Sequence, residues 1–269
     1  MKLWYQSMTR QTEWGSYPRV LRGILDKVRD PDTEIHIAGI TEIGGVGDQF
    51  RYLEYLETGE VLRNVHRAMR EGFDAFLVGN IADPGLQEAR EIADIPVLGL
   101  CESALHMACM MGASFSLVTI NQKFTPRIVE NVRRYGLRDR LAAVNQMQVE
   151  RLTDLGVAFD DAAARERIVA QFDRAAQANA EAGAEVVIAA GGVVMALLAQ
   201  ADIHEAAGMP ILNGITNLVK LGEMVVKTNR LMGGRFTSKR CTYAPPPPEQ
   251  IGELRKHYGA EIYPTVTEP

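Results

Sequence analysis

The sequence predicts an α/β fold with two parallel sheets related by approximate two-fold symmetry. Short apolar runs alternate along the chain with stretches of helical periodicity, which favours parallel strands joined by helices. Residues 72–101 read GFDAFLVGNIADPGLQEAREIADIPVLGLC, and the same plan returns at residues 183–216 as GAEVVIAAGGVVMALLAQADIHEAAGMPILNGIT. Their opening glycines, Gly72 and Gly183, lie 111 residues apart. This internal echo implies two similar sheets.

The first half of the chain holds four predicted strands, each followed by a helix. Phe73–Val78 is apolar without alternation, as is typical of a parallel strand covered on both faces. Asp83 before Pro84 predicts a helix start, with Asp83 as N-cap and Pro84 at the first helical position. The other predicted strands are Leu3–Tyr5, Glu34–Ile40 and Val97–Leu100, and the other helices are Pro18–Val28, Glu54–Glu71 and Glu102–Met111.

The second half repeats the alternation. Its longest predicted helix, Asp161–Ala182, precedes the apolar run Val186–Ala190. After a glycine turn we expect short helices through Ala207. The remaining predicted strands are Ser114–Ile120, Ala142–Asn145 and Ile211–Leu212, and the remaining helices are Thr125–Tyr135 and Ile215–Met232.

We expect three parts in the chain. Residues 1–112 form the first lobe, with the helix at 215–232 packing back on it, and residues 113–214 form the second lobe. Residues 233–269 form a C-terminal extension in which Pro245–Pro248 favour an extended polyproline conformation before a charged helix, Glu249–Tyr258. We infer that this extension docks on the body or on another subunit.

Composition and charge exclude several classes of protein. With 46% hydrophobic and 23% charged residues, the chain has the balance of a globular protein. A net charge of −5 gives no general field for attracting nucleic acid. The longest uncharged apolar run, Val186–Ala199, is too short to span a bilayer, and the N-terminus lacks the features of a secretory signal. We therefore expect a cytoplasmic protein without a nucleic-acid or membrane partner.

Two further patterns bear on ligands. The glycine-rich segment Thr41–Asp48, TEIGGVGD, matches neither GxxxxGK[ST] nor GxGxxG, so we expect a mobile loop over a cleft rather than a phosphate-binding loop. Three cysteines, Cys101, Cys109 and Cys241, are an odd and sparse set that argues against a disulfide framework. No CxxC or HExxH spacing occurs and the histidines are scattered, so we assign no metal site.

Ligands of open parallel sheets bind beyond the carboxyl ends of the strands. Amides, hydroxyls and helix N-termini follow the predicted strands in both halves, and this chemistry suits a small carboxylate or imide. Turn formation is the competing explanation for the asparagines, and Trp4, Tyr5 and Trp14 could either wall a ring-shaped substrate or pack in the core. The expected substrate-binding residues are Gln6, Ser7, Asn80, Thr119, Asn121, Gly191, Gly192, Asn213 and Thr216.

Four stretches carry a resemblance to a known family. They are ADPGLQEARE at 82–91, IPVLGLCESA at 95–104, SFSLVTINQKFTPRIVENVRRYGL at 114–137 and MPILNGITNLVKLGE at 209–223. In order and spacing they resemble the aspartate/glutamate/hydantoin racemase superfamily, and within it the hydantoin racemase branch. The resemblance implies two flavodoxin-like α/β lobes, an active site in the cleft between them and no cofactor.

The resemblance also exposes a departure. The family's chemistry implies two cysteines on opposite faces of the substrate, at the ends of the two echoing strands. Here these positions match Asn80, in GNIADPG, and Gly191, in IAAGG, which keep the 111-residue offset of the echo. Neither an amide nor a glycine exchanges a proton near neutral pH, so a symmetric two-thiol racemisation cannot run at these positions.

Four other residues are candidates for the catalytic role. Cys101 follows a predicted strand and begins a helix, whose dipole would lower the pKa of the thiol, although a small buried residue is the competing interpretation. Glu102 matches the glutamate of the family's strand-end motif and could act as a base, or merely favour the helix dipole. Asp83 is a cap or a catalytic carboxylate, and His106 lies one turn beyond Glu102, within pairing distance.

Two functions of different classes follow. The first is a cofactor-independent enzyme that acts on a small cyclic imide, hydantoin or carboxylate through a reaction diverged from two-cysteine racemisation: an isomerase, lyase, decarboxylase or hydrolase. The second is a non-catalytic small-molecule binding protein that retains the racemase cleft. Apolar helix faces make a homo-oligomer our expectation for the assembly.

Overall fold

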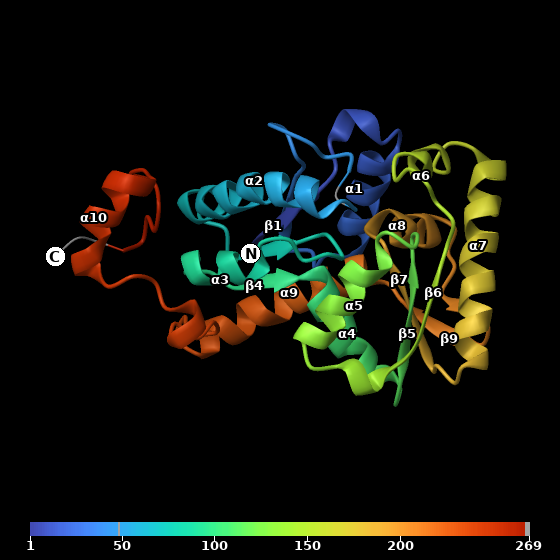
Figure 1. Ribbon diagram of the computed structural model, residues 1–269. Coiled ribbons are helices and arrows are strands. Elements are labelled where there is room, and N and C mark those ends of the chain that lie inside the picture. Colours follow the sequence, from blue (N-terminus) through green and yellow to red (C-terminus); the bar gives the residue numbers. More distant parts are fainter. Residues whose placement is uncertain (48, 267–269) are drawn as a thin grey trace.

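The protein consists of two α/β lobes, each built on an open sheet (Figure 1). The computed structural model describes residues 1–47 and 49–266. The first sheet has the strand order β2-β1-β3-β4, and all of its strands are parallel. The second has the order β6-β5-β7-β9-β8, in which β8 alone among the described strands is antiparallel to its neighbour.

In the first lobe, strands and helices alternate as expected. The strands are β1 (Lys2–Gln6), β2 (Glu34–Ala38), β3 (Ala75–Val78) and β4 (Val97–Gly99). The helices are α1 (Tyr17–Val28), α2 (Arg51–Arg70), α3 (Leu86–Ile92) and α4 (Leu100–Met111), with a single 3-10 turn, η1 (Gln11–Glu13), after β1.

In the second lobe the same alternation continues. The strands are β5 (Phe115–Thr119), β6 (Leu141–Gln146), β7 (Val186–Ala190), β8 (Glu205–Ala206) and β9 (Met209–Leu212). The helices are α5 (Thr125–Arg134), α6 (Asp154–Val157), α7 (Ala162–Glu181), α8 (Gly192–Gln200) and α9 (Gly214–Leu231), with a 3-10 turn η2 (Arg138–Arg140) before β6.

The two sheets confirm the internal echo. The order β2-β1-β3-β4 of the first sheet is matched element for element by β6-β5-β7-β9 of the second, and it is the order of a flavodoxin-like sheet. The echoing segments are β3-α3-β4 and β7-α8-β9, and in each the first strand lies beside the second in its sheet. Both β3 and β7 are buried along their whole length, as strands covered on two faces must be.

One predicted element of the second lobe is wrong. The helical pattern does not run through Ala207, because α8 ends at Gln200 and Glu205–Ala206 pair with β9 as an antiparallel strand. Ala207 and Gly208 both adopt positive φ, of 51° and 75°, which makes the tight turn between β8 and β9. A short turn of this kind leaves little signal in the pattern of apolar residues.

The long C-terminal helix α9 returns to the first lobe. It contacts α1, α4 and β3. Gly222 of α9 lies so close to β3 that a Cβ there would approach a methyl group of Leu77 to 3.0 Å. The start of α9 is capped by Asn213, whose Oδ1 accepts the backbone N–H of Ile215 at 3.1 Å.

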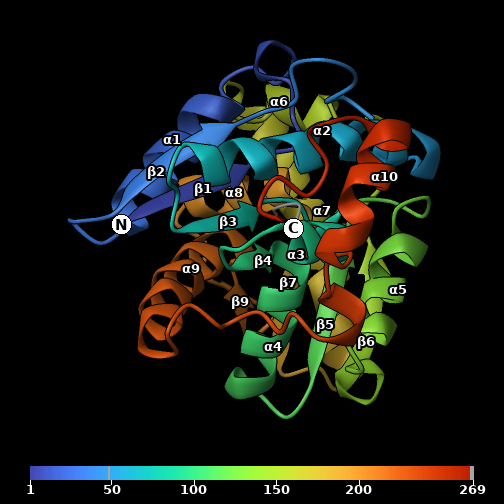
Figure 2. The ribbon, with the colours of Figure 1, turned by 90° about the vertical axis from the view of Figure 1, so that its left-hand side faces the viewer.

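The extension after α9 docks on the body. It contains η3 (Cys241–Tyr243) and α10 (Pro248–Tyr258), and it crosses the end of the first lobe beside α3 (Figure 2). Lys239 Nζ donates to the backbone oxygens of Arg90 and Glu91, and the hydroxyl of Tyr263 donates to Glu91. Within the described residues, no helix combines the length and the apolar composition needed to cross a bilayer.

Candidate functional site

A pocket lies where the carboxyl ends of the central strands of both sheets meet. Its empty volume, open solvent at the mouth included, is about 460 Å³. Segments following β1, β3, β5 and β7 line it, together with the start of α1 and the α6 segment. The lining residues are Ser7, Met8, Thr9, Trp14, Tyr17, Gly79, Asn80, Ile81, Ile120, Phe124, Leu152, Leu155, Gly191, Gly192 and Val193. The sequence-based expectation that these strand ends converge is confirmed.

The first lobe contributes the polar side chains of the pocket. The hydroxyls of Ser7 and Thr9 lie 2.8 Å apart just beyond β1. Because one hydroxyl donates to the other, the pair retains a second O–H that can be directed to a ligand. Asn80, directly after β3, turns its Oδ1 onto the backbone N–H of Ala82 at 2.8 Å. Hydroxyls and a carboxamide can thus bind both the N–H and the C=O groups of a ligand.

The second lobe contributes glycines and a helix N-terminus. A Cβ on Gly191 would stand 2.7 Å from Ile120 Cδ1, whereas a Cβ on Gly192 would meet nothing closer than the carbonyl oxygen of Gly79 at 3.8 Å. An added side chain would therefore find open space at Gly192 but not at Gly191. Gly192 is the first residue of α8, whose leading amides have no partner within the helix and can stabilise negative charge.

The roof of the pocket is built from loops of both lobes. Trp14 is buried and donates from Nε1 to the carbonyl of Gly45 at 2.8 Å. That carbonyl also accepts the backbone N–H of Arg10, so the glycine-rich loop is bound at Gly45 to the segment that follows β1. Asp48 of the same predicted loop lies outside the described residues. From the second lobe, Leu152 and Leu155 close the opposite side with apolar contacts.

A hydrogen-bonded latch joins these two roof segments. Asp160, just after α6, accepts the hydroxyl of Ser16 at 2.6 Å and the backbone N–H of Ser16 at 3.3 Å. Ser16 directly precedes α1, and Tyr17, the first residue of α1, points its ring toward Phe159 at a centroid distance of 5.6 Å. The α6 segment of the second lobe is therefore fastened to the residues that carry Tyr17.

Tyr17 adds a phenol hydroxyl to the lining. Of the lining residues in the described part of the chain, it alone has a titratable side chain. Its hydroxyl would lie 4.0 Å from a Cβ on Gly192. Below it, burial raises the pKa of Tyr5 well above its usual value, and the neighbouring Tyr17 adds to this effect. The Tyr5 hydroxyl is buried without a hydrogen-bond partner in the structure, directly under Gly79.

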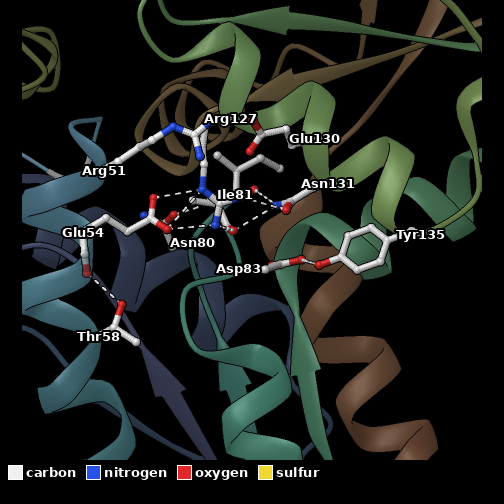
Figure 3. A network of polar contacts seen from close by, with 11 residues as sticks. Arg51, Glu54, Thr58, Asn80, Ile81, Asp83, Arg127, Glu130, Asn131 and Tyr135 are labelled. Carbon is white, nitrogen blue, oxygen red and sulfur yellow. Dashed lines mark hydrogen bonds and ion pairs between the residues drawn. The ribbon is translucent and has the colours of Figure 1, made fainter. Parts of the chain in front are cut away.

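The turn that follows Asn80 is held by a buried polar network (Figure 3). Arg127 of α5 forms a two-pronged ion pair with Glu54 of α2, with Nη2 at 2.8 Å from Oε1. Arg127 also donates to the carbonyl of Ala82 at 2.7 Å. Tyr135 donates its hydroxyl to Asp83 Oδ2 at 2.6 Å. The loop of the first lobe is thus fixed by side chains from the second.

Asp83 is a helix cap, but not of the helix predicted. The helix α3 begins at Leu86 behind Gly85, and Asp83 itself adopts a positive φ of 51°. Its two carboxylate oxygens instead accept the backbone N–H groups of Cys101 and Glu102, both at 2.9 Å, so it caps α4 from another segment. Burial raises the pKa of Asp83 to about 7, although these hydrogen bonds oppose the shift.

The structure places Cys101, Glu102 and His106 outside the pocket. Cys101 is fully buried in the apolar core, and burial, followed by the nearby Asp83, raises the pKa of its thiol. The expected lowering of the thiol pKa by the helix dipole is wrong, because burial raises that pKa and the Asp83 carboxylate at the helix end raises it further. Glu102 forms an ion pair with Arg90, and His106 Nδ1 lies 2.8 Å from the backbone oxygen of Glu102 rather than from its carboxylate.

Among the predicted binding residues, Ser7, Asn80, Gly191 and Gly192 line the pocket, and the other five do not. Their polar groups serve the fold. The Gln6 side chain hydrogen-bonds to Asn64 and to the backbone oxygen of Ser7, and Thr119 hydrogen-bonds to Thr125. Asn121 donates to Gln49 and to the backbone oxygen of Val149. Asn213 and Thr216 form the cap of α9. Turn and cap formation, the competing explanation, accounts for Asn121 and Asn213.

Sequence reasoning missed several lining residues. Tyr17 was missed because it was placed at the end of the loop before the predicted helix Pro18–Val28, whereas it is the first residue of α1. Leu152 and Leu155 were missed because they lie in a segment without clear periodicity. Of the three aromatic residues considered as walls, Trp14 lines the pocket, whereas Trp4 packs in a separate apolar cluster with Phe76. Within residues 1–47 and 49–266, no group of three His, Cys, Asp or Glu side chains is placed to hold a metal ion.

Comparison with known proteins yields consistent matches. A family model described as Asp/Glu/Hydantoin racemase matches residues 18–222. A hydantoin racemase of Pseudomonas sp. (strain NS671) is 32% identical over 228 residues, which cover 83% of this chain and 84% of that protein. Two solved structures cover 91% of this chain. Allantoin racemase from Pseudomonas fluorescens has a TM-score of 0.77 and 25% identity, and the match covers 97% of its chain. Allantoin racemase from Klebsiella pneumoniae has a TM-score of 0.75 and 24% identity, and the match covers 94% of its chain.

Proposed function

The chain belongs to the Asp/Glu/hydantoin racemase family, and on this premise we propose that it binds a small hydantoin-like ring between its lobes and exchanges a proton at a ring carbon from one face. Tyr17 is the acid–base group in this proposal. The observation that supports it is the lining of the pocket, where Tyr17 alone among the described lining residues is titratable and its hydroxyl would lie 4.0 Å from a Cβ on Gly192.

The chemistry of the pocket supports a cyclic imide or ureide as substrate. Hydantoin and allantoin, the compounds in the names of the relatives, share a flat five-membered ring with alternating C=O and N–H groups. The Ser7–Thr9 hydroxyl pair and the Asn80 carboxamide can bind both kinds of group, while Trp14 and Phe124 offer apolar surface to the ring. The same hydroxyl and amide donors can also bind the oxygens of a small carboxylate.

The proton transfer uses Tyr17 in both directions. The Tyr17 phenolate takes the proton from the ring carbon beside the carbonyl, and the electron pair of the C–H bond moves onto the carbonyl oxygen. The leading amides of α8, at Gly192 and Val193, stabilise the negative charge of this enolate. The phenol O–H exchanges its proton with solvent, and Tyr17 then delivers a solvent-derived proton to the same carbon. With a single acid–base group, the proton returns to the face from which it left.

This assignment differs from two-thiol chemistry in its dependence on pH. A phenol acts as a base only after it has lost its own proton, so the exchange rate should rise with pH until Tyr17 has ionised. No cofactor takes part in any of these steps.

Tyr17→Phe tests the assignment because it removes one oxygen from the pocket and leaves the ring in place. Wild-type protein and the variant are incubated with 5-substituted hydantoins in D₂O, with binding measured in parallel by calorimetry. We expect the variant to bind the ligand within a few-fold of wild type and to lose deuterium incorporation by about 100-fold or more. Full exchange activity in Tyr17→Phe would remove Tyr17 from the mechanism.

A second candidate is a non-catalytic binding protein that retains the family's cleft. The absence of thiol, carboxylate and imidazole groups among the described lining residues favours it. The same experiment separates the two functions. Ligand-induced stabilisation without deuterium incorporation by wild-type protein supports binding alone, whereas incorporation above the enzyme-free rate excludes it.

A further inference from the structure

The side chain that follows β3 depends on a short turn for its direction. Asn80 Oδ1 accepts the N–H of Ala82 at 2.8 Å, which closes a small ring over the intervening peptide. The orientation of the Asn80 carboxamide is therefore set by the peptide unit between Ile81 and Ala82. A rotation of that peptide would turn the carboxamide away from the pocket.

The carbonyls of this turn are bound from the second lobe. Asn131 of α5 donates from Nδ2 to Ala82 O at 2.9 Å and approaches Ile81 O at 3.4 Å. Arg127, one turn earlier on the same helix, donates from Nη2 to Ala82 O at 2.7 Å. Figure 3 shows both side chains reaching down from α5 onto the turn. Two successive peptide units thus have their oxygens fixed by one helix.

Arg127 and Asn131 form one unit. Arg127 Nη1 donates to Asn131 Oδ1 at 2.8 Å, which orients the Asn131 amide so that its N–H groups face the turn. The ion pair with Glu54 of α2 holds the guanidinium plane on its other side. Both charged side chains are nearly fully buried, so the geometry is sheltered from exchange with water.

We propose that Arg127 is a positioning residue, which acts with Asn131 to hold the Asn80 turn and so links the geometry of the first-lobe site to helix α5 of the second lobe. Its effect on catalysis rests on the proposed function; its effect on the turn does not. A planar guanidinium is needed here because three acceptors, on Glu54, Asn131 and Ala82, lie around it in different directions.

The test compares Arg127→Lys with a matched control. Lysine keeps the positive charge beside Glu54 but cannot bond all three acceptors. The control, Glu130→Gln, cuts the Arg51–Glu130 ion pair, which also joins α2 to α5 but is half-exposed and does not touch the turn. The first readout is the hydrogen-exchange rate of the Ala82 amide by NMR, with the amides of β5 as an internal measure of folding.

We expect the Ala82 amide to exchange about tenfold faster in Arg127→Lys, while the β5 amides stay protected and Glu130→Gln resembles wild type. The second readout is deuterium transfer to a hydantoin, which should fall on the order of 10-fold to 100-fold in kcat with little change in KM. If Arg127→Lys does not fold, Asn131→Ser replaces it, because that change also removes a donor to Ala82 O.

Unchanged protection of the Ala82 amide in the folded variant would overturn the positioning role. An equal loss of Ala82 amide protection in Glu130→Gln would also overturn the positioning role, because the effect would then come from general loosening of α2 against α5. If wild-type protein turns over no hydantoin, the proposed function fails, and the amide exchange rates still decide whether Arg127 holds the turn.

Discussion

At the scale of single residues, Asp83 shows how a correct motif can serve an unexpected partner. The Asp-Pro pair has the form of a helix start, yet the carboxylate crosses to the N-terminus of α4 and binds two of its amides. The choice depends on Gly99, where a Cβ would lie 2.6 Å from the Asp83 carboxyl group, so the close approach requires glycine. This contact joins two segments that the sequence gives no reason to pair.

The raised pKa of Asp83 has a measurable effect on stability. Its folded-state pKa, about 7, lies above the unfolded value of about 4, so the native state binds the proton more tightly. Stability contributed by this group is therefore present at low pH and is lost as pH rises from about 4 to about 7. In urea unfolding, the stability of wild type relative to Asp83→Asn should fall by up to about 1 kcal/mol per pH unit in this window. A difference independent of pH would contradict the assignment.

Two glycines of the pocket should respond oppositely to alanine. A Cβ on Gly79 would stand 2.3 Å from the ring of the buried Tyr5, whereas a Cβ on Gly192, the first residue of α8, would find open space. Gly79→Ala should cost about 1–3 kcal/mol or more through overpacking, and Gly192→Ala should change stability by less than about 1 kcal/mol. Ligand binding should weaken in Gly192→Ala because the new methyl group enters the pocket. Thermal unfolding with and without a hydantoin measures both effects.

At the scale of elements, the short helix α6 has a function out of proportion to its length. It lies in an irregular segment between β6 and α7, and it brings Leu155 and the latch residue Asp160 onto the first lobe. A ligand enclosed by Trp14 and Leu155 must displace part of this roof to leave. The latch between Ser16 and Asp160 should therefore control the rate of ligand exchange more than the stability of the fold.

Two adjacent aspartates allow this prediction to be tested with a built-in control. Asp160→Ala removes an exposed latch, so stability should change by less than about 1 kcal/mol while ligand dissociation becomes several-fold faster. Asp161→Ala removes the N-cap of α7, whose carboxylate accepts the backbone N–H of Ala164 at 3.0 Å, and should lower stability without altering ligand kinetics. Stopped-flow dissociation and urea unfolding separate the two. An unchanged rate of ligand dissociation in Asp160→Ala would contradict this role of the contact between Ser16 and Asp160.

At the scale of the whole molecule, the sequence predicted two α/β lobes with parallel sheets but missed strand β8. Apolar runs such as Val186–Ala190 and helical stripes indicate local burial, and the echo indicates that two sheets share a plan. The flavodoxin-like character of the lobes was implied by the resemblance to the racemase superfamily. Strand ends then located the pocket, including Ser7, Asn80 and Gly192. These inferences succeed because they depend on periodicity and spacing, which are properties of the chain itself.

The sequence could not show which polar residues line the pocket, because this depends on contacts between distant segments. Cys101 sits at a strand end like Asn80, yet it faces the core, and no local pattern separates the two directions. Tyr17 ends a predicted loop, and only the approach of Gly192 from the other lobe brings its hydroxyl into the pocket lining. The 111-residue spacing favoured Gly191 as the position opposite Asn80, whereas the space available to an added Cβ favours Gly192.

The stereochemistry of proton exchange tests the central claim, a one-sided acid–base site, most directly. One enantiomer of a 5-substituted hydantoin is incubated with the protein in D₂O, and deuterium at the ring carbon and enantiomeric excess are followed in the same sample against an enzyme-free control. We predict that deuterium accumulates well ahead of any loss of enantiomeric excess, because Tyr17 returns the proton to the face it left. Inversion accompanying each incorporated deuterium would show two acid–base groups on opposite faces and would contradict the account.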